Sequence, residues 1–123
     1  MGAHFKDLVV WQESMNLAKQ VIITTQSFPR HETYGLAAQI RKAAVSVPSN
    51  ISEGQQRFSN VDFRHFLRIS RGSLGELETQ LILATDLDYM SKDQLDSFSK
   101  QISLIGKLIA GLIKSLNARA ASA

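Results

Sequence analysis

The sequence predicts an all-α fold, an antiparallel up-down-up-down four-helix bundle formed by a single domain over residues 1–123. Apolar residues recur at steps of three and four in four long segments, and short polar turns separate these segments. A content of 44% hydrophobic and 20% charged residues is typical of a globular domain. A chain of this length is also long enough to bury a substantial core.

The first helix is predicted over residues 7–26, because two apolar stripes with helical spacing run along this segment. The stripes are Leu8, Trp11, Met15, Ala18 and Ile22, and beside them Val10, Leu17 and Val21. The β-branched run "VIITT" could also form a strand, but the stripes upstream favour the last turns of the helix. Pro29 biases Phe28 away from helical geometry, which predicts a turn at "SFPRHETYG".

The second helix is predicted over residues 34–56, although Pro48 lies inside it. A proline removes one helical hydrogen bond, here to the carbonyl of Ala44, and costs about 3 kcal/mol relative to alanine. The apolar stripe nevertheless keeps its phase on both sides of the proline. Its members are Leu36, Ile40, Ala43, Val47 and Ile51. Phase continuity predicts one helix with a kink at Pro48 rather than two separate helices.

The third helix is predicted over residues 59–89. Ser59 followed by Asp62 resembles a capping box, with aspartate in place of glutamate. The apolar positions are Phe63, Phe66, Leu67, Leu74, Leu77, Leu81, Ala84 and Leu87. Gly72 and Gly75 lie inside this pattern, and we interpret them as points of close helix packing, at a cost of about 1 kcal/mol each.

The fourth helix is predicted over residues 91–117, and Ser91 with Gln94 forms a capping box at its start. Its apolar seam is Leu95, Phe98, Ile102, Ile105, Ile109, Leu112 and Leu116. Leu104 and Leu108 add a second stripe, and the tail "NARAASA" is expected to fray. Because the first and last helices both carry more apolar surface than one buried face needs, we predict a subunit interface.

The composition limits the chemistry, the compartment and the partners that can be expected for the protein. The absence of cysteine excludes disulfides and thiolate chemistry. No apolar run approaches the roughly 18 residues of a membrane span, and the N-terminus does not resemble a secretory signal. We therefore expect a cytoplasmic protein without a membrane partner. The net charge of +3 is compatible with a nucleic-acid partner but does not require one.

Residues suited to catalysis or metal binding do not form a recognisable motif. His4, His31 and His65 are scattered, and neither a Glu-x-x-His nor a His-x-x-x-His motif is present. The "GSLG" segment lies in a helix rather than after a strand, so it is not a phosphate-binding loop. We expect no catalytic residues, no metal and no cofactor. An enzyme whose site forms at subunit contacts is the weakest hypothesis.

Basic residues are arranged in stripes. Arg64, Arg68 and Arg71 share one helical face, and Arg57 lies one heptad before Arg64. Arg41 and Lys42 belong to the preceding helix, and a possible second stripe consists of Lys100, Lys107 and Lys114. Counterion release would favour binding of such stripes to a polyanion, although they could equally be solvated faces paired with carboxylates. No aromatic ladder interleaves them, so stacking of single strands is not expected.

The segment "QIRKAAVSVPSNISEG" resembles a signature of the four-helix-bundle proteins encoded in intervening sequences of 23S rRNA genes. "LVVWQESM", "FPRHETYGL" and "RFSNVDFRHFLRISRGSLGELETQLILATDLDYM" are similar to other segments of this family, so the resemblance spans residues 5–116. Lys42 and Val47 depart from it conservatively. The resemblance implies a left-handed bundle, a homopentamer around a central channel, and a Pro48 motif that shapes the bundle.

The same fold is similar to the accessory variability protein of diversity-generating retroelements. This similarity implies basic surfaces that bind nucleic acid and a protein partner such as a reverse transcriptase. Our first hypothesis is therefore a non-enzymatic, homo-oligomeric scaffold that binds RNA or DNA through its basic helix faces. The alternative is a protein–protein adaptor that does not bind nucleic acid.

Overall fold

The computed structural model describes residues 4–122 and confirms the predicted all-α fold, since no strand occurs within that range. It contains four α-helices and two single-turn 3-10 helices. In chain order these are η1 (Phe5–Asp7), α1 (Val9–Thr25), η2 (Arg30–Glu32), α2 (Leu36–Gln56), α3 (Asn60–Asp86) and α4 (Lys92–Ser122). The run "VIITT" forms the end of α1, as predicted, and is not a strand.

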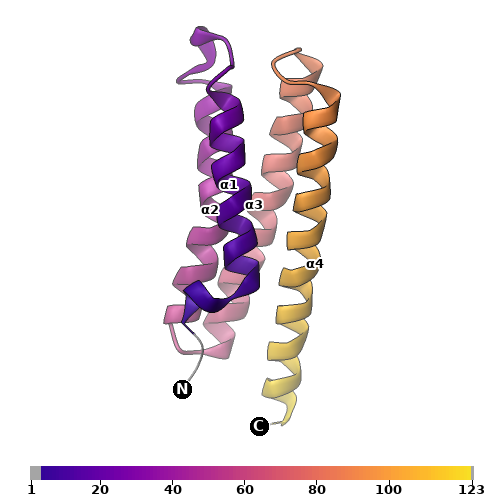
Figure 1. Ribbon diagram of the computed structural model, residues 1–123. Coiled ribbons are helices and arrows are strands. Elements are labelled where there is room, and N and C mark those ends of the chain that lie inside the picture. The colour runs from indigo at the N-terminus through magenta and orange to yellow at the C-terminus, as the bar shows by residue number, and fades with distance from the viewer. Residues whose placement is uncertain (1–3, 123) are drawn as a thin grey trace.

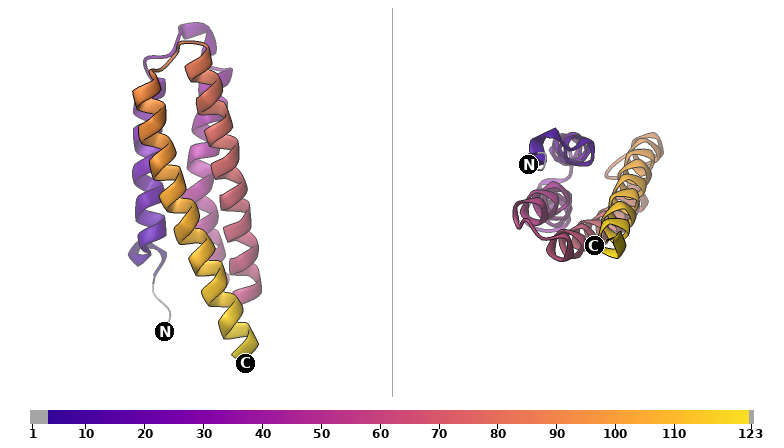
Figure 2. Two further views of the ribbon diagram at one scale, coloured as in Figure 1. Left: turned by 90° about the vertical axis from the view of Figure 1, so that its right-hand side faces the viewer. Right: turned by 90° about the horizontal axis from the view of Figure 1, so that it is seen from below.

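The helices run alternately up and down, so that both ends of the chain lie at the same end of the molecule (Figure 1). Each helix packs against its neighbour in sequence, and α1 also contacts α4 to close the bundle. The α1–α4 pairing is the least extensive of these contacts, and the end-on view of Figure 2 shows α4 inclined away from α1. The seam between α1 and α4 is therefore the most open side of the bundle.

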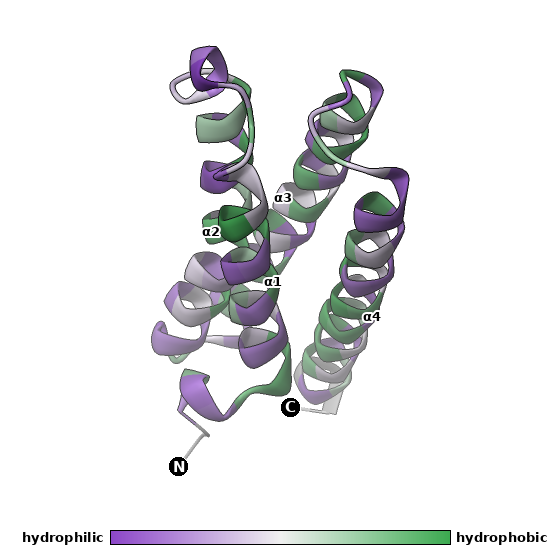
Figure 3. Cartoon of the chain, turned by 45° about the horizontal axis from the view of Figure 1, so that its top comes forward, coloured by the Kyte–Doolittle hydropathy of each residue, from purple (hydrophilic) through white to green (hydrophobic). Residues whose placement is uncertain are grey.

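The core is built from the inward faces of four amphipathic helices. Figure 3 shows hydrophobic and hydrophilic segments alternating along the helices, as such a bundle requires. On α2, four residues of the predicted stripe are buried, namely Ile40, Ala43, Val47 and Ile51. On α1 the two predicted stripes separate: Val10, Leu17 and Val21 are buried in the core. The neighbouring stripe lies at the edge of the core: Met15 is 45% exposed, Ile22 is half-buried and Ala18 is buried.

Helix α2 continues without a break through Pro48, which confirms the predicted continuity, whereas the kink itself stays a prediction. Two hydrogen bonds join α2 to α3 immediately before the proline. The buried Ser70 hydroxyl donates to the Val47 carbonyl at 2.8 Å, and the hydroxyls of Ser46 and Ser73 are 2.8 Å apart. Asn50 donates to the Ser46 carbonyl at 2.8 Å. The two bonds to α3 fix the register of α2 against α3 next to the position where the helix has lost a backbone donor, whereas the Asn50 bond lies within α2.

Gly54 marks the closest approach of α2 and α3. A β-carbon at this position would lie 2.6 Å from the Phe66 Cβ and 3.2 Å from the Phe63 Cδ1. Neither contact is with the end of a flexible side chain, so a larger residue would push the two helices apart. Gly54 therefore sets the distance between the end of α2 and the start of α3.

The interpretation of Gly72 and Gly75 as points of close packing is wrong. Both glycines are exposed, and a β-carbon at either position would meet no atom within 4 Å. The leucines of α3 stay in register across them because the helix continues, not because another helix packs there. The bundle therefore gives no packing reason for glycine at these two positions.

We expect Gly75→Ala to stabilise the protein. Alanine restricts the unfolded chain and favours helix by about 0.5–1 kcal/mol in an exposed helix interior, which raises the unfolding temperature by roughly 2–5 °C. Thermal denaturation followed by circular dichroism measures the effect. Gly54→Ala is the matched control and should lower the unfolding temperature because of its 2.6 Å contact. A lower unfolding temperature for Gly75→Ala would contradict the open environment of this glycine.

The helix ends agree with the capping predictions but not with every predicted boundary. The Ser59 and Ser91 hydroxyls accept bonds from the backbone N–H groups of Asp62 and Gln94, at 3.3 Å and 3.1 Å. Helix α3 ends before the predicted residue 89, because Asp88 adopts a left-handed conformation with φ 62°. The prediction that the tail frays after residue 117 is wrong, since α4 continues to Ser122. Its alanines are strong helix formers.

Candidate nucleic-acid interface and apolar groove

The three arginines predicted on one face of α3 have different environments. Arg68 and Arg71 are exposed to solvent. Arg64 is half-buried, and its Nη1 donates to the carbonyl of Leu116 on α4 at 3.3 Å. Arg64 therefore links α3 to α4. Of the three arginines, Arg68 and Arg71 are the two that are fully accessible to a ligand.

Arg41, Arg57 and Lys42 also differ from one another. The half-buried Arg41 donates through Nε to the Thr25 hydroxyl at 2.8 Å, which joins α2 to the end of α1. Arg57 forms an ion pair with Glu53 at 2.7 Å, and its guanidinium lies 5.1 Å from the Phe66 ring centroid. Lys42 is exposed beside Glu76 in a polar hollow between α2 and α3. Of these three, only Lys42 is exposed without such a partner.

The second basic stripe lies on α4. Lys100, Lys107 and Lys114 are all exposed. The Glu53–Arg57 pair is the one ion pair found within residues 4–119. Apart from Arg57, the cations of the two stripes therefore have no carboxylate at contact distance, contrary to what a paired, solvated face would show. The stripes belong to adjacent helices, since α3 packs directly on α4.

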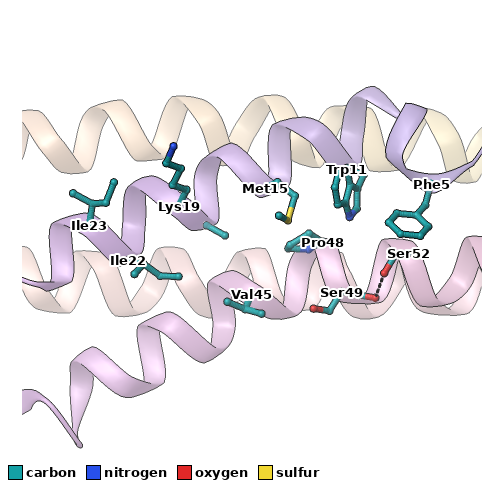
Figure 4. A pocket seen from close by; sticks show the side chains of 11 residues that line it. Phe5, Trp11, Met15, Lys19, Ile22, Ile23, Val45, Pro48, Ser49 and Ser52 are labelled. Atoms are coloured by element: carbon teal, nitrogen blue, oxygen red, sulfur yellow. Dashed lines mark hydrogen bonds between the residues drawn. The ribbon is translucent and has the colours of Figure 1, made fainter.

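An apolar groove of about 620 Å³ lies between α1 and α2 on the outer side of the bundle (Figure 4). Its walls are the stripe of α1 at the edge of the core, the facing residues of α2 and one residue of η1. The lining residues are Phe5, Trp11, Met15, Ala18, Lys19, Ile22, Ile23, Val45, Pro48, Ser49 and Ser52. Met15 and Val45 are each 45% exposed, so part of the apolar lining is open to solvent.

The sequence identified one wall of this groove and missed the other. The extra apolar stripe of the first helix is the α1 wall. The α2 wall was not recognised, although Val45, Pro48, Ser49 and Ser52 recur at helical spacing and could have indicated it. The extra stripe of the last helix is only partly uncovered, since Leu104 is 47% exposed and Leu108 is half-buried.

A polar cluster closes the opposite end of the bundle from the chain termini. The Glu32 carboxylate accepts the N–H of Leu36 at 3.1 Å, which caps α2, and the Tyr89 hydroxyl at 2.9 Å. The bond from Leu36 is the main cause that lowers the pKa of Glu32, and the bond from Tyr89 adds to it. The hydrogen bond from the Tyr89 hydroxyl to Glu32 also raises the pKa of Tyr89. Glu32 thus links the α1–α2 turn to the turn before α4.

We expect Glu32 to make the stability of the bundle depend on pH. Its folded pKa is lower than the ordinary value of 4.5, so its contribution is complete above pH 4.5 and is lost as the pH falls through the folded pKa. Glu32→Gln should therefore unfold at a lower temperature than the wild type at pH 7, and the difference should be smaller at pH 3. Thermal unfolding at the two pH values measures this, with Glu13→Gln as a control. An equal difference at both pH values would contradict a role for the charge.

In the described part of the chain, no three histidine or carboxylate side chains lie close enough together to hold a metal ion. His31 lies near Tyr89, with 3.4 Å between the ring Nε2 and the hydroxyl, whereas His65 stacks edge-on against Phe66. The histidines therefore do not converge on one site. No helix among the described residues is both long and apolar enough to cross a membrane.

Four amphipathic helices around one core place the protein in the class of all-helical four-helix bundles. The chain belongs to the family of 23S rRNA-intervening sequence proteins, whose family model matches residues 6–111. A solved structure from Bacteroides thetaiotaomicron, described as a protein of unknown function from the S23 ribosomal protein family, is similar to it.

This structural relative is 26% identical in sequence and superposes with a TM-score of 0.80. The comparison covers 86% of this chain and 99% of the other, so the likeness extends over the whole bundle. None of the curated proteins compared with the chain gives a significant match. Neither the family description nor the relative's name indicates an enzyme-type fold.

Proposed function

We propose that the protein is a non-enzymatic, homo-oligomeric scaffold that binds nucleic acid through the basic faces of α3 and α4. The observation that carries this proposal is the set of exposed cations without carboxylate partners, namely Arg68, Arg71, Lys100, Lys107 and Lys114. Binding to phosphates would release condensed counterions, which favours a protein that presents unneutralised cations on adjacent helices.

Phosphate contacts alone would give little sequence discrimination. Arginine matches phosphate oxygens with its planar fork, whereas lysine acts as a mobile point charge. Neither stripe lies on a helix with an established mode of entering the major groove, so base readout is not expected from these side chains. The proposed activity is therefore salt-sensitive binding with weak sequence preference.

The apolar groove supports the oligomeric part of the proposal. The lining of the groove is mainly apolar and partly open to water, and burial against another copy would remove that surface from water. The groove is concave, so a protruding surface of the next copy would fill it, and the contact is heterologous where that surface lies elsewhere on the bundle. Such heterologous contacts form rings when the rotation closes. The family resemblance supplies five as the expected number of subunits.

A gel-shift assay with a structured RNA and a DNA duplex tests the proposed binding directly. We expect both to be retarded at low salt and released as the salt concentration rises, because the contacts are to phosphates. Light scattering of the same preparation gives the assembly state. The absence of a shift with both probes at 50 mM salt would refute nucleic-acid binding.

A protein–protein adaptor is the second candidate, and the groove is the observation that favours it. Its apolar lining contains one charged residue, Lys19, and no carboxylate. An adaptor of this kind would fill the groove with a helix of a partner protein, and the basic stripes would only aid solubility. The gel-shift assay separates the two candidates, because the adaptor would leave both probes unshifted.

A further inference from the structure

Phe58 projects from the turn between α2 and α3 and is 92% exposed. Its backbone is in the left-handed region, with φ 57°. Glycine or asparagine usually occupies this position just after a helix, because a side chain larger than theirs is strained there. The chain thus holds a large aromatic ring in water, on a backbone conformation that disfavours it.

Nothing inside the bundle compensates for this arrangement. The ring is not part of the core, unlike Phe63 in the next helix, which packs against the core and approaches Gly54. Strained non-glycine residues concentrate at ligand-binding and switching sites, where the free energy of ligand binding offsets the cost of the strained backbone. An exposed ring on such a backbone therefore indicates a contact with a ligand from outside the bundle.

A hollow of about 370 Å³ lies beside Phe58 at the end of the bundle where both chain ends lie. Apolar side chains form part of its wall, and the polar groups include the side chain of Arg119 on α4. The lining residues are Leu8, Gln55, Phe58, Ser59, Asn60, Phe63, Leu112, Leu116 and Arg119. No carboxylate lines the hollow; the nearest acids along the chain are Glu53, paired with Arg57, and Asp62 in the first turn of α3.

We propose that this hollow binds an unpaired nucleotide of a single-stranded nucleic acid, with the base stacked on Phe58 and the phosphate next to Arg119. An almost fully exposed flat ring, a partly apolar recess and a cation without a competing carboxylate match a base and its phosphate. A purely apolar ligand would not use the arginine. Every base has a π-face, so the site accepts bases without strong sequence preference.

This inference rests on the proposed nucleic-acid binding and adds a preference for unpaired strands. It also modifies the expectation from the sequence that stacking would be absent. That expectation concerned a ladder of aromatic residues, whereas the structure presents one isolated ring at an end of the bundle. When a short single-stranded segment or loop lies next to a duplex, the phosphates of the nucleic acid would lie on the basic stripes and one unpaired base would stack on Phe58.

Fluorescence anisotropy with a labelled 20-nucleotide oligo(dT) and a blunt 20-base-pair duplex tests the proposal on the full chain. We expect Phe58→Gly and Phe58→Asn to weaken oligo(dT) binding about 5- to 30-fold, within the range of one lost base–aromatic stack. Duplex binding should change less than about twofold, since a blunt duplex offers no unpaired base. Phe58→Tyr keeps the ring and should bind like the wild type.

Two controls separate a loss of stacking from a loss of structure. Phe58→Gly relieves the left-handed strain, so its unfolding temperature should not fall below that of the wild type. Tyr34→Gly removes another ring, 97% exposed in the α1–α2 turn, and should leave oligo(dT) affinity unchanged. Two outcomes would overturn this inference alone. In the first, Phe58→Gly binds oligo(dT) as tightly as the wild type; in the second, it loses the same affinity for oligo(dT) and for the duplex. Absence of wild-type binding to both probes would overturn the proposed function and this inference together.

Discussion

Replacement of Arg68, Arg71, Lys107 and Lys114 by glutamine is expected to weaken duplex binding about 10²- to 10³-fold at 100 mM salt. Each lost phosphate contact removes nearly one released counterion, so affinity falls by up to a factor of ten per contact at this salt concentration. The plot of log affinity against log salt should become shallower by about 3 to 4. All four side chains are exposed, so helix content and assembly state should not change.

The matched control removes charge outside the two stripes. Lys6 in η1 and Lys92 at the start of α4 are exposed at opposite ends of the bundle, and their replacement by glutamine should change affinity less than about threefold. If the stripe variant binds as tightly as the wild type, the stripes are only solvated faces. The adaptor hypothesis would then take precedence.

Glutamates in the groove are expected to convert the oligomer into a 13.6 kDa monomer. Met15 and Val45 lie on the two walls of the groove and are each 45% exposed in the isolated bundle, so Met15→Glu with Val45→Glu should leave the fold intact. The groove offers one cation, Lys19, so in an assembly at least one carboxylate would be buried against apolar side chains without a partner, at a cost of several kcal/mol. Multi-angle light scattering at micromolar concentration measures the mass.

Val61→Glu is the control for this experiment, because Val61 is 65% exposed on α3 and outside the groove. It should leave the assembly unchanged. A double groove variant that keeps the mass of the wild-type assembly would mean that the groove is not a subunit interface. A wild-type protein that scatters as a monomer would refute the oligomer itself.

The helices could be predicted from the sequence because local patterns determine them. The apolar stripe of α2 kept its phase across Pro48, and the helix is continuous there. Ser59 and Ser91 cap the helices that they were expected to start. Such signals act over three or four residues, so they need no knowledge of the partner helix.

Contacts between helices could not be predicted in the same way. Gly72 and Gly54 both lie in helices, yet only Gly54 meets a neighbouring helix, and no local pattern distinguishes them. Likewise, the heptad spacing places Arg64 with Arg71, but only the tertiary fold directs Arg64 to the Leu116 carbonyl. The left-handed backbone of Phe58 depends on how α2 ends against α3, which the sequence "RFSN" does not reveal.

The salt dependence of duplex binding by the wild-type protein tests the central proposal most directly. If the assembled protein contacts five to ten phosphates, log affinity should fall linearly with log salt, with a slope of roughly −5 to −9. The titration by anisotropy between 50 and 300 mM salt requires no variant. A slope in this range would agree with phosphate binding by the stripes on α3 and α4. No detectable binding at 50 mM salt, or an affinity independent of salt, would contradict it.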